Sequence, residues 1–89
     1  TAKNGRLASI FEAWQEGKKI IIEWNTEHPF YDRFVIENKD NQHLVTSVDF
    51  LIYSLAAAQI QAMGDDEDKA IMVENIISTM STNMRALLS

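Results

Sequence analysis

The sequence places one histidine beside two carboxylates, in an arrangement that could move protons. His28 and Asp32 are four residues apart, and Glu27 precedes the histidine. On a helix this spacing puts His28 and Asp32 on one face, as a general base and the carboxylate that orients it would be. No nucleophile, second histidine or glycine-rich loop accompanies them. We therefore expect no enzyme activity, and the pair supports only an alternative function, a small-ligand or metal-binding regulatory domain.

Two further acidic features are candidate cation sites with simpler explanations. The acidic run at 65–68 offers the oxygens that hard cations prefer, but it lacks the alternating spacing and closing glutamate of an EF-hand loop. Such a run also suits the first turn of a helix. Asp49 stands in an otherwise apolar stretch, and a helix that starts at Thr46 or Ser47 would place it in the first turn. We predict no metal site and no cofactor.

The length and composition predict one small domain whose own hydrophobic core is only marginally sufficient to stabilise it. A chain of 89 residues is near the size at which a single hydrophobic core is marginal. The absence of cysteine excludes disulfides and thiolate metal sites, which leaves oligomerisation or attachment to a larger parent protein. The hydrophobic fraction of 46% is typical of a folded domain. We predict a single domain over residues 1–89, as a fragment of a longer protein.

The charge pattern argues against nucleic acid and membrane partners. The net charge is −5, and the eight basic residues are scattered along the chain. No basic cluster is present to neutralise nucleic-acid phosphates or an anionic lipid surface. The longest apolar stretch, residues 50–58, is interrupted and too short to cross a bilayer. With no cysteine and no export signal, we expect a cytoplasmic protein.

The second half of the chain, residues 43–88, predicts a helical hairpin. Residues 43–63 are rich in good helix formers and precede Gly64, which suits the position after a helix end. Apolar residues lie on most sides of this segment, so we expect a central helix that is covered on most sides. The acidic run then starts a second helix that continues to Leu88. Because the connection is very short, the two helices should run antiparallel.

The second predicted helix carries a heptad-like seam of apolar residues. They step by four, three, four and three residues from position 73 to position 87, which is the spacing of helices that pack on helices. Methionines in this seam suit both cores and adaptable interfaces. Together with two leucines of the first helix, the seam predicts a protein interface made of Leu51, Leu55, Val73, Ile77, Met80, Met84 and Leu87.

The first half, residues 1–25, predicts a β-hairpin. Residues 18–24 are rich in β-branched and aromatic side chains, as strands are. The apolar residues from Leu7 to Trp14 have helical spacing, but a strand at 18–24 needs a partner. Residues 15–18 form a plausible turn in which Gly17 supplies a positive φ. We therefore favour a strand over a helix for residues 7–15.

A short helix is predicted at 28–37, between the hairpin and the long helices. Pro29 suits the first position of a helix, and the residues that surround it form a compact polar and aromatic motif. We expect a structural role for this motif, which consists of Asn25, His28, Pro29, Phe30 and Tyr31. The fold class that follows is α+β, with a short N-terminal β-hairpin, one short helix and two long antiparallel helices.

Residues 18–63 resemble a region beyond the ATPase core in some uncharacterised bacterial and phage ATPases. These belong to the gyrase–Hsp90–histidine kinase–MutL (GHKL) superfamily. The similarity lies in the strand Ile20–Trp24, in Asn25 with the His-Pro-Phe-Tyr motif at 28–31, and in the Leu/Ala-rich helix at 51–59. The magnesium-binding asparagine helix and the D-x-G-x-G loop of the superfamily are missing. The resemblance therefore implies a C-terminal module that cannot bind ATP by itself.

These observations predict a non-catalytic assembly or dimerisation module, the C-terminal part of a GHKL-type ATPase. Its partner would be a second copy of the chain or other domains of the parent protein. The alternative remains a small-ligand or metal-binding regulatory domain that uses His28 and Asp32.

Overall fold

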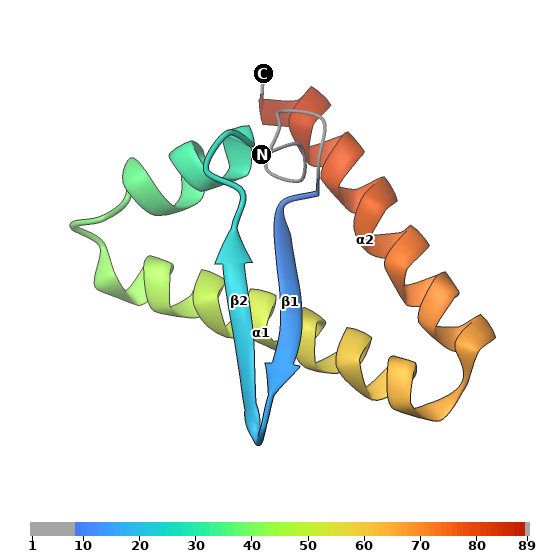
Figure 1. Cartoon of the computed structure of the whole chain (residues 1–89). Coiled ribbons are helices and arrows are strands. Elements are labelled where there is room, and N and C mark those ends of the chain that lie inside the picture. The colour runs from blue at the N-terminus through green and yellow to red at the C-terminus, as the bar shows by residue number, and fades with distance from the viewer. Residues whose placement is uncertain (1–8, 89) are drawn as a thin grey trace.

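The computed structural model describes residues 9–88, which form a β-hairpin, a short helix and two long helices (Figure 1). The strands are β1 (Phe11–Glu16) and β2 (Lys19–Trp24), the short helix is η2 (Tyr31–Ile36), and the long helices are α1 (Gln42–Asp65) and α2 (Glu67–Leu88). The predicted α+β fold, with an N-terminal β-hairpin, a short helix and then two long helices, is confirmed. Residues 1–8 of the predicted hairpin region, Leu7 included, lie outside the described residues.

The hairpin is a two-stranded antiparallel sheet, and Gly17 lies in the turn that connects its strands. Its register runs from Phe11 opposite Trp24 to Glu16 opposite Lys19. Gly17 has a φ of 62°, and no other described residue has a positive φ. A positive φ at the first of two loop residues is the type II′ turn that matches the twist of the strands. The role predicted for Gly17 is confirmed, although the turn lies one residue later than residues 15–18.

The short helix begins at Pro29 and then widens into a π-type turn over Tyr31–Ile36. The Glu37 N–H donates to the Asp32 carbonyl at 2.8 Å, which is an i to i+5 hydrogen bond. Residue spacing in the sequence does not signal this widening.

Helix α1 starts earlier and ends later than predicted. The side chain of Asn41 caps its start by accepting from the Leu44 N–H at 3.2 Å. Asp49 therefore lies about two turns into the helix, and the prediction that it occupies the first turn is wrong. Gly64 lies inside α1 without a positive φ, so the prediction that it follows the helix end is also wrong.

One residue, Asp66, both ends α1 and starts α2. Its extended backbone leaves the helix path, and its N–H donates to the Ala62 carbonyl at 3.1 Å. Its side chain accepts from the N–H of Asp68 at 2.8 Å and of Lys69 at 3.4 Å, as an N-cap does. The two helices turn back on each other here, and their other ends diverge (Figure 1).

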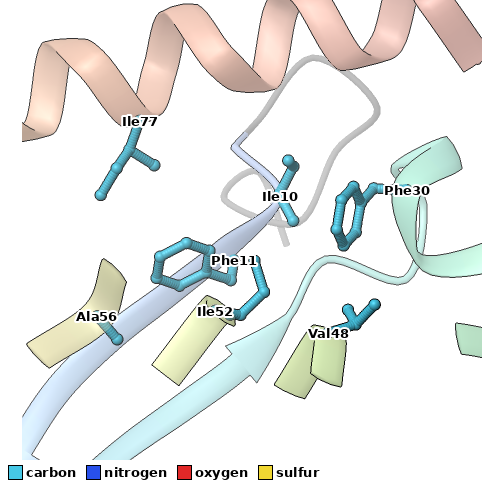
Figure 2. Close-up of a cluster of buried hydrophobic side chains, with 7 residues drawn as sticks. All are labelled: Ile10, Phe11, Phe30, Val48, Ile52, Ala56 and Ile77. Carbon is cyan, nitrogen blue, oxygen red and sulfur yellow. The ribbon is translucent and has the colours of Figure 1, made fainter. Parts of the chain in front are cut away.

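The hydrophobic core lies where the hairpin meets α1 and α2 (Figure 2). Helix α1 contributes Val48, Ile52 and Ala56, which are four residues apart and so share one face. The other members of the cluster are Ile10 and Phe11 at the start of the hairpin, Phe30 of the motif, and Ile77 of α2. The expectation that α1 would be covered on most sides is wrong, because the hairpin, η2 and α2 together leave one side of the helix exposed.

Candidate functional site

His28 sits in the interior with both ring nitrogens engaged. Its side chain is fully buried. Nδ1 accepts a hydrogen bond from the Phe30 N–H at 3.1 Å, so the ring hydrogen is on Nε2, which lies 2.9 Å from the Ser81 carbonyl oxygen and donates to it. Burial lowers the pKa of His28; the hydrogen bond to Ser81 opposes this shift, and the positive charge of Arg85 adds to it. The imidazole is therefore held neutral.

Ser81 connects three parts of the chain at one buried position. Its hydroxyl donates to the Ile77 carbonyl at 2.8 Å and accepts from the Ile10 N–H at 3.0 Å, while its own carbonyl accepts from His28. Ser81 is thus the point where the entry to β1 and the His-Pro-Phe-Tyr loop are fastened to α2. Sequence reasoning missed Ser81, since a serine inside a helix gives no signal of such long-range partners.

Asn25 and the aromatic residues of the motif complete this anchor. The buried Asn25 side chain donates to the Ser9 carbonyl at 3.0 Å and accepts from the Glu27 N–H at 3.1 Å. Trp24 stacks on Phe30 with ring centroids 5.9 Å apart, and Tyr31 is tilted against Trp24 at 5.8 Å. The side chains of Asn25 and His28 thus bond to backbone groups, and the rings of Phe30 and Tyr31 pack on Trp24 of β2.

The geometry of this cluster is not that of a nucleophile and its base. His28 contacts the carbonyl of Ser81 and not its hydroxyl, and both side chains are buried. Asp32, by contrast, is exposed on η2. A metal would also find no ligand set, since residues 9–88 contain no group of three or more His, Cys, Asp or Glu side chains that could hold an ion.

Most of the predicted interface residues pack inside the domain. Ile77 is only 4% exposed in the core, and the partly buried residues packed against that core include Leu55, Val73, Met80 and Met84. Part of the α2 seam is therefore used inside the domain, against the core and α1. Of the predicted set, Leu51 and Leu87 remain exposed, at 62% and 77%.

One stretch of exposed apolar surface lies on the side of α1 that faces away from the core. Phe50 is 71% exposed there and Leu51 62%. Helix α2 also carries exposed apolar residues, among them Met72, Ile76 and Leu87. Ser54, Ala58 and Gln61 are exposed on the same side as Phe50 and Leu51 and carry no charge. We name this set, Phe50, Leu51, Ser54, Ala58 and Gln61, the outer face of α1. A sequence signal for it existed, since residues 44–64 contain a single charged residue, Asp49.

Beside the outer face lies an open pocket of about 500 Å³ between β2 and α1. This volume is within the range of ligand pockets, roughly 300–1,000 Å³. It is lined by Ile22, Trp24, Asp49, Phe50, Ile52 and Tyr53.

Helix α1 is the one described helix long and apolar enough, by length and composition, to cross a membrane. Core helices of soluble proteins pass the same test. Here Val48, Ile52 and Ala56 pack on the hairpin and α2, which gives the helix a role in the domain core.

The chain matches no protein-family model, no curated protein and no solved structure.

Proposed function

We propose that this domain is a non-catalytic assembly module that dimerises through the outer face of α1. The observation that carries the proposal is the exposure of Phe50 and Leu51, at 71% and 62%, in the middle of a 24-residue helix. Contiguous exposed apolar surface of this kind marks protein interaction sites in soluble proteins.

A second copy of the chain suits this face because the face is uncharged. Each copy carries a net charge of −5, so most of its surface repels another copy. The outer face carries none of that charge, and its small residues Ser54 and Ala58 allow two helices to approach closely. Contact of the same patch on both subunits gives a closed two-fold dimer.

The resemblance to the C-terminal region of GHKL-type ATPases is compatible with this role, and it remains part of the proposal. In such a parent protein the module would bring two ATPase subunits together without contributing catalytic groups. The buried motif of His28 and Asn25 would then serve to fix α2 against the hairpin.

Site-directed crosslinking tests the proposed contact directly, because the chain has no cysteine of its own. Ser54→Cys places a thiol in the middle of the outer face, where two copies related by a two-fold axis bring equivalent residues together. We expect a disulfide-linked dimer under mild oxidation. Thr82→Cys, at an exposed position of α2, is the matched control and should crosslink far more slowly. Equal rates for the two variants would refute the α1 interface.

A membrane is the competing occupant of this face, favoured by the length and composition of α1. Flotation of the chain with neutral phosphatidylcholine vesicles separates the two cases. A soluble dimer stays out of the vesicle fraction, whereas recovery of the chain with the vesicles would overturn the dimer proposal.

A further inference from the structure

Asp49 is an acidic residue without a structural role in the described part of the chain. It is the single charged residue between positions 44 and 64. It lies too far into α1 for a favourable interaction with the helix N-terminus, which acts within the first turn. Its carboxylate has no hydrogen bond or ion pair with any of residues 9–88. Asp49 is exposed, so its carboxylate is solvated in the free chain and is available to a binding partner.

The surroundings of Asp49 are aromatic. It lines the pocket of about 500 Å³ between β2 and α1 together with Trp24, Phe50 and Tyr53. Ile22 and Ile52 supply the remaining apolar lining. Trp24 is held in place by stacking on Phe30, whereas Phe50 and Tyr53 have no ring partner among the described residues. The pocket thus combines three aromatic rings with one unpaired carboxylate.

We propose that this pocket binds the guanidinium group of an arginine side chain on a different protein, one that is not a second copy of this chain. Aromatic faces attract cations through the ring quadrupole, and a carboxylate accepts two parallel hydrogen bonds from a guanidinium. Arginine suits both contacts at once, because it is planar, permanently charged and more weakly hydrated than lysine.

Other classes of occupant fit the pocket less well. A neutral apolar group would remove water from Asp49 without giving it a partner, which is costly for a charge. An anion would be repelled by the carboxylate. A divalent metal ion needs several oxygen ligands, and the pocket lining offers only one carboxylate. The net charge of −5 further favours a basic partner.

The inference rests on the proposed function in one respect only, which is that the arginine in the pocket belongs to a protein partner. Phe50 belongs both to the pocket and to the outer face, so a partner that presents an arginine would lie next to the dimer contact. Binding at the pocket itself needs no dimer, and the two proposals can fail separately.

The test uses N-acetyl-arginine methylamide as the probe, followed by NMR of the full chain. The neutral analogue built on citrulline, which has nearly the same shape, is the control. We expect saturable shifts at the Trp24, Phe50 and Tyr53 rings with an affinity on the order of millimolar, as a single contact gives. Citrulline should cause no saturable shift. Equal shifts with citrulline, or none with arginine, would overturn the proposal.

Two charge-removing variants assign the site. Asp49→Asn should weaken arginine binding about tenfold or more, because a hydrogen bond to a charged group is lost. Asp40→Asn removes an equal charge from an exposed loop residue that does not line the pocket, and it should bind as the wild type does. An unchanged affinity in Asp49→Asn, with its NMR spectrum still that of a folded domain, would refute the role of the carboxylate.

The same variants separate this proposal from the dimer. Arginine binding should persist in Leu51→Asp, which disrupts the outer face but not the pocket lining. The mass of the dimer should be unchanged in Asp49→Asn. If Asp49→Asn instead dissociates the dimer, the occupant belongs to a second copy of this chain, and the assignment to another partner is wrong.

Discussion

The Nε2–H of His28 lies 2.9 Å from the carbonyl oxygen of Ser81, although 53 residues separate the two in the chain. With the Ser81 hydroxyl bonded to the Ile10 N–H at 3.0 Å, this contact fastens the motif loop and the start of β1 to α2. In a chain without cysteine, and so without disulfides, these buried hydrogen bonds connect segments that are far apart in the sequence. By fixing α2, they also keep the apolar seam of that helix turned toward the core.

The domain should lose stability as the pH falls below about 6.5, the ordinary histidine pKa. Burial lowers the pKa of His28 in the folded state, so the unfolded state takes up a proton first. The stabilising effect of neutral His28 is then complete above about pH 6.5 and is lost as the pH falls toward the folded pKa. Urea unfolding at a series of pH values measures it. His28→Gln should flatten the dependence in this range, whereas His43→Gln, at an exposed site, should retain it.

Ser81→Ala should destabilise the fold by about 1–3 kcal/mol, the cost of leaving a buried polar group unpaired. The group that would lose its hydrogen-bond acceptor is the N–H of Ile10, a residue that is fully buried. Thr82→Ala is the control, because its hydroxyl bonds to the Ser78 carbonyl at an exposed site; its effect should stay within about 0.5 kcal/mol. Both are measured by urea unfolding at one protein concentration. Similar values for the two variants would contradict the role assigned to Ser81.

Glu12→Lys should stabilise the hairpin by about 0.2–1 kcal/mol. Glu12 lies directly opposite Glu23, so two like charges face each other across the strands. One buried carboxylate oxygen of Glu23, Oε1, has no hydrogen-bond partner among the described residues. Glu16→Lys makes the reverse change, since Glu16 lies opposite Lys19, and should destabilise. Thermal unfolding distinguishes them, and a shift of the same sign in both would disprove the cross-strand explanation.

Gly64→Ala and Gly17→Ala should have opposite effects. Gly64 lies in α1 with open space where a Cβ would be, so alanine should stabilise by about 0.5–1 kcal/mol through helix propensity. Gly17 has a φ of +62°, a conformation that costs an alanine roughly 1–2 kcal/mol. Urea unfolding of each variant gives the sign directly. A loss of stability in Gly64→Ala would mean that this glycine has a role beyond the helix backbone.

Features set by neighbouring residues were predictable from the sequence. Gly17 before the β-rich residues 18–24 predicts a hairpin turn, and the acidic run at 65–68 predicts a helix start. The start predicted at residue 43 lies one residue from the observed start of α1. The cap was not identified, because Thr46 and Ser47 are as good N-cap types as Asn41 and only the tertiary structure selects among them. A start at Thr46 or Ser47 would put Asp49 in the first turn, and that part of the prediction is wrong.

The candidate sites were harder to predict because they depend on what covers each face. The spacing of Val73, Ile77, Met80 and Met84 correctly marks a face that packs, but an internal core and an interface between chains need the same spacing. The exposed face of α1 follows from the small size of the hairpin, which lies against one side of the helix and leaves Phe50 and Leu51 exposed. The pocket beside Asp49 joins residues of β2 and α1, and no sequence pattern relates them.

The measurement that tests the central claim most directly is the molar mass of the wild-type chain by light scattering behind size exclusion, over a wide dilution series. A dimer through the outer face of α1 predicts about twice the 10.1 kDa of one chain, and about 10.1 kDa for Leu51→Asp with its fold intact. A wild-type mass of one chain at every concentration would contradict the proposal.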